Sequence, residues 1–218
     1  MLCESYGVER MLAYATSAIR EAENGGDFIQ RMIDEVGIKA LAISGKREAD
    51  LIGQAICHAV SVGDETVLMV DIGGGSVEFI LRNKEEVFYS ASKKIGVARM
   101  AADFVSHDPI TKKEIVRLRK YFNRELMDLF DVMEMHQVRT IIGSSGTMEN
   151  IADMIANRES ITASITLNEF TYSSDSYRKF HKNFIGMNRE ERLDQSGLEE
   201  KRVDIITPGL GRDPGFAD

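Results

Sequence analysis

An aspartate followed by a glycine-rich turn marks the place where one apolar run ends and another begins. The stretch from residue 67 to residue 81 reads VLMVDIGGGSVEFIL, and its turn contains Asp71, Gly73, Gly74, Gly75 and Ser76. Glycine permits positive φ and leaves room for backbone N–H groups to converge on an anion. A carboxylate beside such a turn is suited to a divalent cation. We expect a phosphate site here, with Asp71 as the metal-associated residue, although a plain β-hairpin turn would also use glycine.

A second carboxylate, Glu78, follows two residues after Ser76. Side chains alternate along a strand, so Glu78 and Ser76 are expected on the same face. Glu78 could orient an attacking water or help to hold a metal. The alternative is a solvent-facing strand residue.

A third carboxylate, Glu48, lies near the start of a predicted helix in the stretch Ile43–Ala49, which reads ISGKREA. A carboxylate at this position could accept a proton from water, a role usually worth about 10²–10⁴-fold in rate. The helix dipole alone also favours glutamate in a first turn. The position by itself therefore favours a structural role for Glu48.

A second small-residue turn consists of Gly143, Ser144, Ser145, Gly146 and Thr147. It stands between a predicted strand and a predicted helix, and a helix N-terminus favours anions. One such turn is weakly specific. Two small-residue turns in one chain predict that both contribute to a single site, one from each side of a cleft.

The elements that must position these residues alternate between strand and helix as far as residue 60. After that point three closely spaced strands predict an antiparallel meander, and a strand and helices follow. The predicted strands are 11–17, 41–43, 67–71, 77–81, 87–91, 139–142 and 165–167, and the predicted helices are 18–36 (interrupted at 24–26 and closed by Gly37), 48–60, 96–105, 112–133, 147–157 and 188–195. This order predicts an α/β fold of the RNase H-like type found in the actin, Hsp70 and sugar kinase superfamily.

Composition narrows the classes of protein that remain. The chain has 218 residues, 43% of them hydrophobic, and a formal net charge of −8. This charge argues against nucleic-acid partners and anionic membranes. The cysteines Cys3 and Cys57 do not suggest a disulfide framework. With no bilayer-length apolar run and no signal-peptide pattern at the first residues, we expect a cytoplasmic protein.

Taken together, the chain resembles the exopolyphosphatase/guanosine pentaphosphate phosphatase (Ppx/GppA) family. The stretches that carry this likeness are Ala15–Asn24, Ile43–Ala49, Asp71–Glu78 and Gly143–Thr147, with a weaker one at Leu198–Gly209. The resemblance implies hydrolysis of terminal phosphoanhydride bonds, with orthophosphate released from polyphosphate or guanosine pentaphosphate and Mg²⁺ as the cofactor.

Site roles follow from the same resemblance. It makes Glu48 the general base, which reverses the interpretation from position alone, and makes Glu78 the second essential carboxylate. Asp71 becomes the metal-associated residue and Gly73–Ser76 the phosphate loop. The turn Gly143–Thr147 would line the cleft, and Arg20, in the first matching stretch, is grouped with the phosphate-binding residues.

The resemblance also predicts the domain organisation. The family begins with an earlier phosphate loop of the D-x-G-S-N-S kind, which is not found before Met11. We therefore expect two RNase H-like lobes, with residues 1–62 as an incomplete first lobe, 63–160 as the second lobe, and 161–218 as its truncated C-terminal part. A homodimer is expected. A catalytically silent nucleotide- or polyphosphate-binding fragment and a kinase of the same superfamily are the alternatives.

Overall fold

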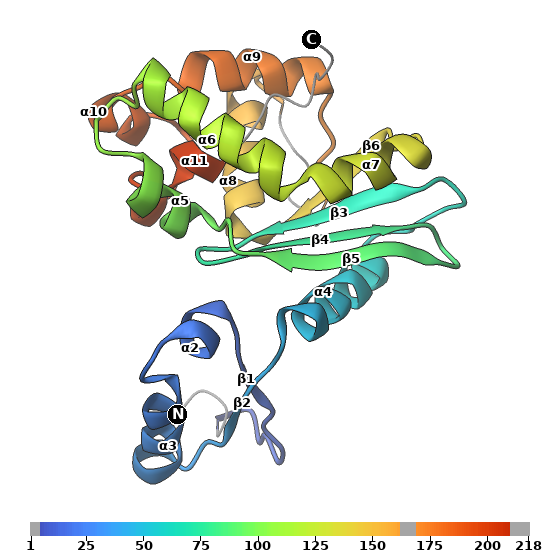
Figure 1. The fold of residues 1–218 in the computed structure, drawn as a ribbon, viewed down its shortest axis with the longest axis vertical. Coiled ribbons are helices and arrows are strands. Elements are labelled where there is room, and N and C mark those ends of the chain that lie inside the picture. The colour runs from blue at the N-terminus through green and yellow to red at the C-terminus, as the bar shows by residue number, and fades with distance from the viewer. Residues whose placement is uncertain (1–4, 162–168, 210–218) are drawn as a thin grey trace. The chain divides into compact units, whose positions relative to one another are not determined.

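A computed structural model describes residues 5–161 and 169–209 of the chain. The chain divides into two compact units between Glu48 and Ala49. Figure 1 shows the elements of each unit in chain order. The strand predicted at 165–167 lies outside the described residues. The lobe boundaries predicted at residues 62 and 160 remain predictions.

In its described residues before α4 (Gly45–Ala59), the first unit contains a parallel pair of short strands and two helices. These elements are β1 (Ala13–Ala15), α2 (Ser17–Glu21), α3 (Gly25–Val36) and β2 (Ala40–Ala42). The helix is interrupted slightly earlier than the predicted residues 24–26: α2 ends at Glu21, and Gly25 and Gly26 already belong to α3. A Cβ atom at Gly25 would run into the carbonyl group of Ile19. Gly37 closes α3 with a φ of 72°, as the sequence predicts, because glycine tolerates the left-handed conformation.

Among the described residues, the second unit is built on a four-stranded sheet in the order β5-β4-β3-β6. The strands are β3 (Val67–Ile72), β4 (Val77–Arg82), β5 (Val87–Lys93) and β6 (Thr140–Ser144). Strands β3, β4 and β5 form the predicted antiparallel meander, and β6 runs parallel to β3. The parallel β6 returns to the sheet only after the helices that follow β5.

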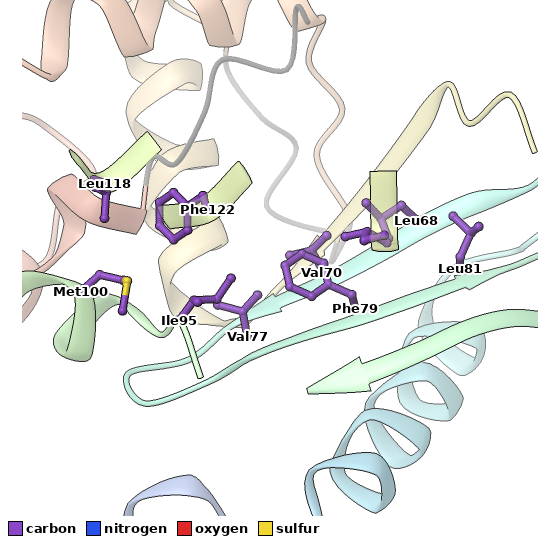
Figure 2. Close-up of a cluster of buried hydrophobic side chains, with 10 residues drawn as sticks. Leu68, Val70, Val77, Phe79, Leu81, Ile95, Met100, Leu118 and Phe122 are labelled. Carbon is purple, nitrogen blue, oxygen red and sulfur yellow. The ribbon is translucent and has the colours of Figure 1, made fainter. Parts of the chain in front are cut away.

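Helices cover both faces of this sheet (Figure 1). Helix α4 (Gly45–Ala59) lies on one face, where Ala49 and Ile56 join Met69 and Ile80 in a buried cluster. Because strand residues alternate, their neighbours point to the opposite face. That face packs against α5 (Val97–Phe104), α6 (Lys112–Glu125) and α7 (Met127–Met135). Figure 2 shows this second cluster, whose labelled members are Leu68, Val70, Val77, Phe79, Leu81, Ile95, Met100, Leu118 and Phe122.

One long helix predicted over residues 112–133 is corrected to two. Helix α6 begins with the predicted capping box of Thr111 and Glu114 and ends at Glu125. Leu126 then leaves the helical region, with φ −110° and ψ 10°, before α7 begins. The apolar spacing of the sequence does not reveal this break.

The described residues in the C-terminal part of the second unit are mainly helical. It contains α8 (Ser145–Arg158), α9 (Ser174–Phe184), α10 (Arg189–Leu193), a 3₁₀ turn (Glu200–Arg202) and α11 (Ile206–Gly209). Ile151 and Ile155 of α8 pack against Phe180 and Phe184 of α9. Helix α9 was not predicted from the sequence, whereas α10 falls within the predicted helix at 188–195. None of the helices in the described ranges has the length and apolar character required to cross a membrane.

Candidate active site

Strand register aligns a row of polar residues across the sheet of the second unit. Asp71 on β3 is paired with Glu78 on β4 and, on its other side, with Ser144 on β6. Glu78 is in turn paired with Ser92 on β5. Directly paired residues in neighbouring strands share a face, so the four side chains stand on one face. This is the face that carries Met69 and Ile80 under helix α4.

Glu78 is the most enclosed member of this row. Glu78 is only 2% exposed, which contradicts the alternative that it is a solvent-facing strand residue. The Ser76 hydroxyl donates to Glu78 Oε1 at 2.7 Å, and the Ser92 hydroxyl donates to the same oxygen at 2.6 Å. A buried carboxylate requires such partners, and hydrogen bonds to an ionised acceptor are the strong ones. Strand alternation predicted that Ser76 and Glu78 share a face, but only the register of β5 reveals Ser92.

The glycine-rich loop caps a helix with its carbonyl groups. The backbone N–H of Val97 donates to the Gly73 carbonyl at 3.0 Å, and those of Ala98 and Arg99 donate to the Gly74 carbonyl at 2.9 and 3.2 Å. These are N–H groups of the first turn of α5, which have no acceptor within their own helix. The loop and the start of α5 therefore hold each other in place.

The N–H groups of the loop are not used in the same way. Within the described part of the chain, those of Gly74, Gly75 and Ser76 donate to no backbone or side-chain acceptor. Three adjacent N–H groups with no internal partner are suited to an anion. The loop therefore has the donors that the sequence predicts for a phosphate site.

Positive φ does not explain the glycines of the loop. None of Gly73, Gly74 and Gly75 is among the described residues with positive φ. A Cβ atom at Gly73 would lie 3.0 Å from the Ser76 carbonyl oxygen, whereas one at Gly74 would make only an ordinary contact of 3.8 Å with the Ala98 Cβ atom. The tight position is Gly96 before α5, where a Cβ atom would lie 2.5 Å from the carbonyl carbons of Gly74 and Gly75. Gly96 was not singled out by the sequence, where its only signal is its position just before a helix.

The second small-residue turn is joined to the end of β3. The hydroxyl groups of Ser145 and Thr147 donate to the Ile72 carbonyl at 3.0 and 3.1 Å, next to Asp71. The structure thus brings the two predicted turns together within the second unit. Ser145 has a φ of 77°, a left-handed conformation that is uncommon for serine and is often found at functional sites.

An arginine missed as a site residue lies against this turn. Arg202 Nη1 lies 3.4 Å from Thr147 Oγ1, and a Cβ atom at Gly146 would be 2.7 Å from Arg202 Cζ. Gly146 therefore provides room for the guanidinium group. Thr147 is buried and its hydroxyl is occupied, so its part in any phosphate contact would come from its backbone N–H.

The remaining two predicted site residues, Glu48 and Arg20, pair with each other in the first unit. Arg20 Nη1 lies 2.8 Å from Glu48 Oε2 and donates to the Ile43 carbonyl at 3.0 Å. Both side chains are largely covered, with 20% and 13% of their surface exposed. The ion pair fixes the orientation of the Glu48 carboxylate at the start of α4. Arg20, which the resemblance grouped with the phosphate-binding residues, therefore contacts the carboxylate that the resemblance makes the general base.

Comparison with known proteins places these features in context. A model of the Ppx/GppA phosphatase family matches residues 1–211. Exopolyphosphatase 1 of Mycobacterium tuberculosis is 26% identical over 206 residues, which cover 94% of this chain and 59% of that protein. This chain therefore spans about three fifths of the length of such curated relatives.

Solved structures give the same picture. An exopolyphosphatase from Cytophaga hutchinsonii aligns with a TM-score of 0.88 and 32% identity over 96% of this chain and 67% of its own. The Aquifex aeolicus member of the Ppx/GppA family aligns with a TM-score of 0.76 and 27% identity over 96% and 67% of the two chains. The predicted α/β fold class of RNase H-like type is confirmed by this likeness.

Proposed function

The chain belongs to the Ppx/GppA phosphatase family, and from this premise we propose that it hydrolyses terminal phosphoanhydride bonds. Inorganic polyphosphate is the proposed substrate, with guanosine pentaphosphate as a second one. The observation that carries the proposal is the glycine loop. In the described residues the N–H groups of Gly74, Gly75 and Ser76 have no internal acceptor, and the loop stands beside the buried Glu78 carboxylate.

The loop would bind the terminal phosphoryl group. The N–H groups of Gly74, Gly75 and Ser76 can donate to its oxygens, and the helix α5 that packs behind the loop keeps them in place. Preorganised donors directed at developing charge are usually the largest contribution to such catalysis. The turn at residues 143–147 and Arg202 would supply further contacts to the anionic chain.

Asp71 suits Mg²⁺ as the cofactor. In the described ranges no group of three or more His, Cys, Asp or Glu side chains could hold a metal ion. Mg²⁺ commonly binds through one or two carboxylates, several waters and substrate phosphates, so a single half-buried carboxylate beside a phosphate loop meets its needs. When bound, the ion would neutralise charge on the phosphoryl oxygens.

The two glutamates would have different roles. In hydrolysis the water oxygen bonds to the terminal phosphorus, the bridging P–O bond breaks, and the water proton must be accepted. We assign that proton to Glu48 by the family resemblance, and its ion pair with Arg20 would hold the accepting carboxylate in one orientation. Glu78 would act as the fixed carboxylate beside the loop.

Self-association is a further part of the proposal. Tyr14 and Leu41 are paired in the two-stranded sheet of the first unit and are 49% and 54% exposed. Adjacent exposed apolar side chains of this kind often mark interaction surfaces. We propose a homodimer, to be tested by the molar mass in solution of the chain and of a Leu41→Ser variant.

Phosphate release tests the proposed activity directly. Polyphosphate and guanosine pentaphosphate would each be incubated with Mg²⁺ and the chain, its Glu48→Gln variant, or Glu35→Gln as a control. Glu35 forms an exposed ion pair with Arg31 on α3, so its change removes a carboxylate without touching Glu48. We expect Glu48→Gln to lose about 10²–10⁴-fold in rate and Glu35→Gln to match the parent.

The outcomes separate the candidate functions. Undiminished phosphate release by Glu48→Gln would refute the assignment of the base. If the parent chain bound polyphosphate without releasing phosphate, the alternative of a binding-only protein would hold. Transfer of phosphate from ATP to a second substrate would instead indicate a kinase.

A further inference from the structure

Ser92 contacts Glu78 of the proposed site from strand β5, an element separate from the glycine loop. Its hydroxyl donates to Glu78 Oε1 at 2.6 Å, across the β4–β5 register in which the two residues are direct partners. Ser76, at the end of the loop, donates to the same oxygen at 2.7 Å. One carboxylate oxygen is therefore held by two hydroxyl groups, one from the loop and one from the sheet.

The positions of these two donors depend on the loop to different degrees. Ser76 is a loop residue whose carbonyl accepts from Gly73, so any rearrangement of the loop around an anion would move it. Ser92 lies within β5, whose pairing to β4 extends from Val77 to Arg82. Although β5 is at the edge of the described sheet, its backbone pairing with β4 makes it a more rigid support than a loop.

We propose that Ser92 is a positioning residue for the phosphatase reaction. It fixes the Glu78 carboxylate from the sheet, so that this carboxylate keeps its orientation while the loop engages a phosphoryl group. The inference rests on the proposed function, because it supposes that Glu78 acts beside the phosphate loop. Ser92 acts through Glu78 and does not contact the substrate.

The chain offers a closely matched control. Ser90 lies two residues earlier on β5, on the same face, and its hydroxyl donates to Asp50 Oδ1 at 3.2 Å. Both serines are half-buried. Ser90→Ala therefore removes the same atom from the same strand face without touching Glu78.

The experiment compares Ser92→Ala, Ser92→Thr and Ser90→Ala. Loss of a hydrogen bond to a charged group corresponds to about 10- to 100-fold in rate, so we expect kcat of Ser92→Ala to fall by that factor with KM nearly unchanged. Ser92→Thr keeps the hydroxyl and should retain kcat. Ser90→Ala should behave as the parent, and thermal melts of all three variants check that they are folded.

A spectroscopic measurement keeps the inference separate from the proposed function. With ¹³C-labelled glutamate, the side-chain carboxyl resonance of Glu78 can be assigned by its absence in Glu78→Gln. It should move in Ser92→Ala, return in Ser92→Thr and stay in place in Ser90→Ala.

The results then decide as follows. An active parent whose kcat survives Ser92→Ala would overturn the inference and leave the proposed function intact. A parent that releases no phosphate would refute the proposed function, and the resonance would still report on Glu78. In that case an unmoved resonance in Ser92→Ala would also overturn the claim that Ser92 holds the carboxylate.

Discussion

Replacing Gly96 by alanine tests whether helix α5 and the glycine loop depend on each other. The φ and ψ of Gly96 are −62° and 156°, which any residue can adopt, so the backbone conformation itself does not require glycine. The added Cβ atom would instead lie 2.5 Å from the carbonyl carbons of Gly74 and Gly75. These are backbone atoms, and no side-chain rotation can relieve the contact. The loop or the helix must move.

The structure gives the size of the effect. If the loop withdraws, the three hydrogen bonds from the N–H groups of residues 97, 98 and 99 to its carbonyl groups are lost. At about 0.5–1.5 kcal/mol each, their loss lowers the free energy of unfolding by about 2–4 kcal/mol. A displacement by an ångström of the N–H groups that we propose to bind phosphate would cost about 10²-fold in phosphate release.

Urea unfolding and phosphate release measure the two consequences. Gly26→Ala is the control, because Gly26 lies in helix α3 with nothing within 4 Å of an added Cβ atom. Alanine there should stabilise the chain by up to about 1 kcal/mol and leave phosphate release unchanged. Parent-like unfolding and parent-like phosphate release for Gly96→Ala would refute the reasoning, because the close approach would then have no energetic consequence.

Two further predictions concern stability away from the site. Hydrogen bonds from His107, and then from Thr111 and Ser106, hold the pKa of Glu114 well below its ordinary value of 4.5. A lowered folded-state pKa stabilises the chain above pH 4.5 and ceases to do so as the pH falls. Glu114→Gln should therefore be less stable than the parent at pH 7, with a gap in urea midpoint that narrows below pH 4.5; a constant gap would contradict this. Left-handed positions away from the site give the other prediction. Gly37 has a φ of 72° with open space around it, so Gly37→Ala should lower the free energy of unfolding by about 1 kcal/mol. Gln137 has a φ of 49°, so Gln137→Gly should raise the free energy of unfolding by a similar amount. Equal urea midpoints for both variants and the parent would contradict the argument.

Several elements could be predicted from local sequence because their causes are local. The capping box at Thr111 and Glu114, the helix end at Gly37 and the three-strand meander each depend on residues within a few positions of one another. The carboxylates and the glycine turn were found in the same way. Helix α9 was not predicted although local signals exist, namely the N-cap Ser173 and the helical spacing of Tyr177, Phe180 and Phe184. The break at Leu126 was also missed, because the apolar spacing continues across it.

The sequence by itself determined which residue types are present and in what local order, and that was enough to predict the α/β fold, the family and the phosphate loop. The tertiary structure decided which of these residues meet. It paired Glu78 with Ser92 through strand register and joined the second turn to Ile72 through β6. It also showed that glycine is needed at position 96 for the approach of a helix rather than for φ. Strand register and close backbone packing join residues far apart in the chain, so no local pattern encodes them.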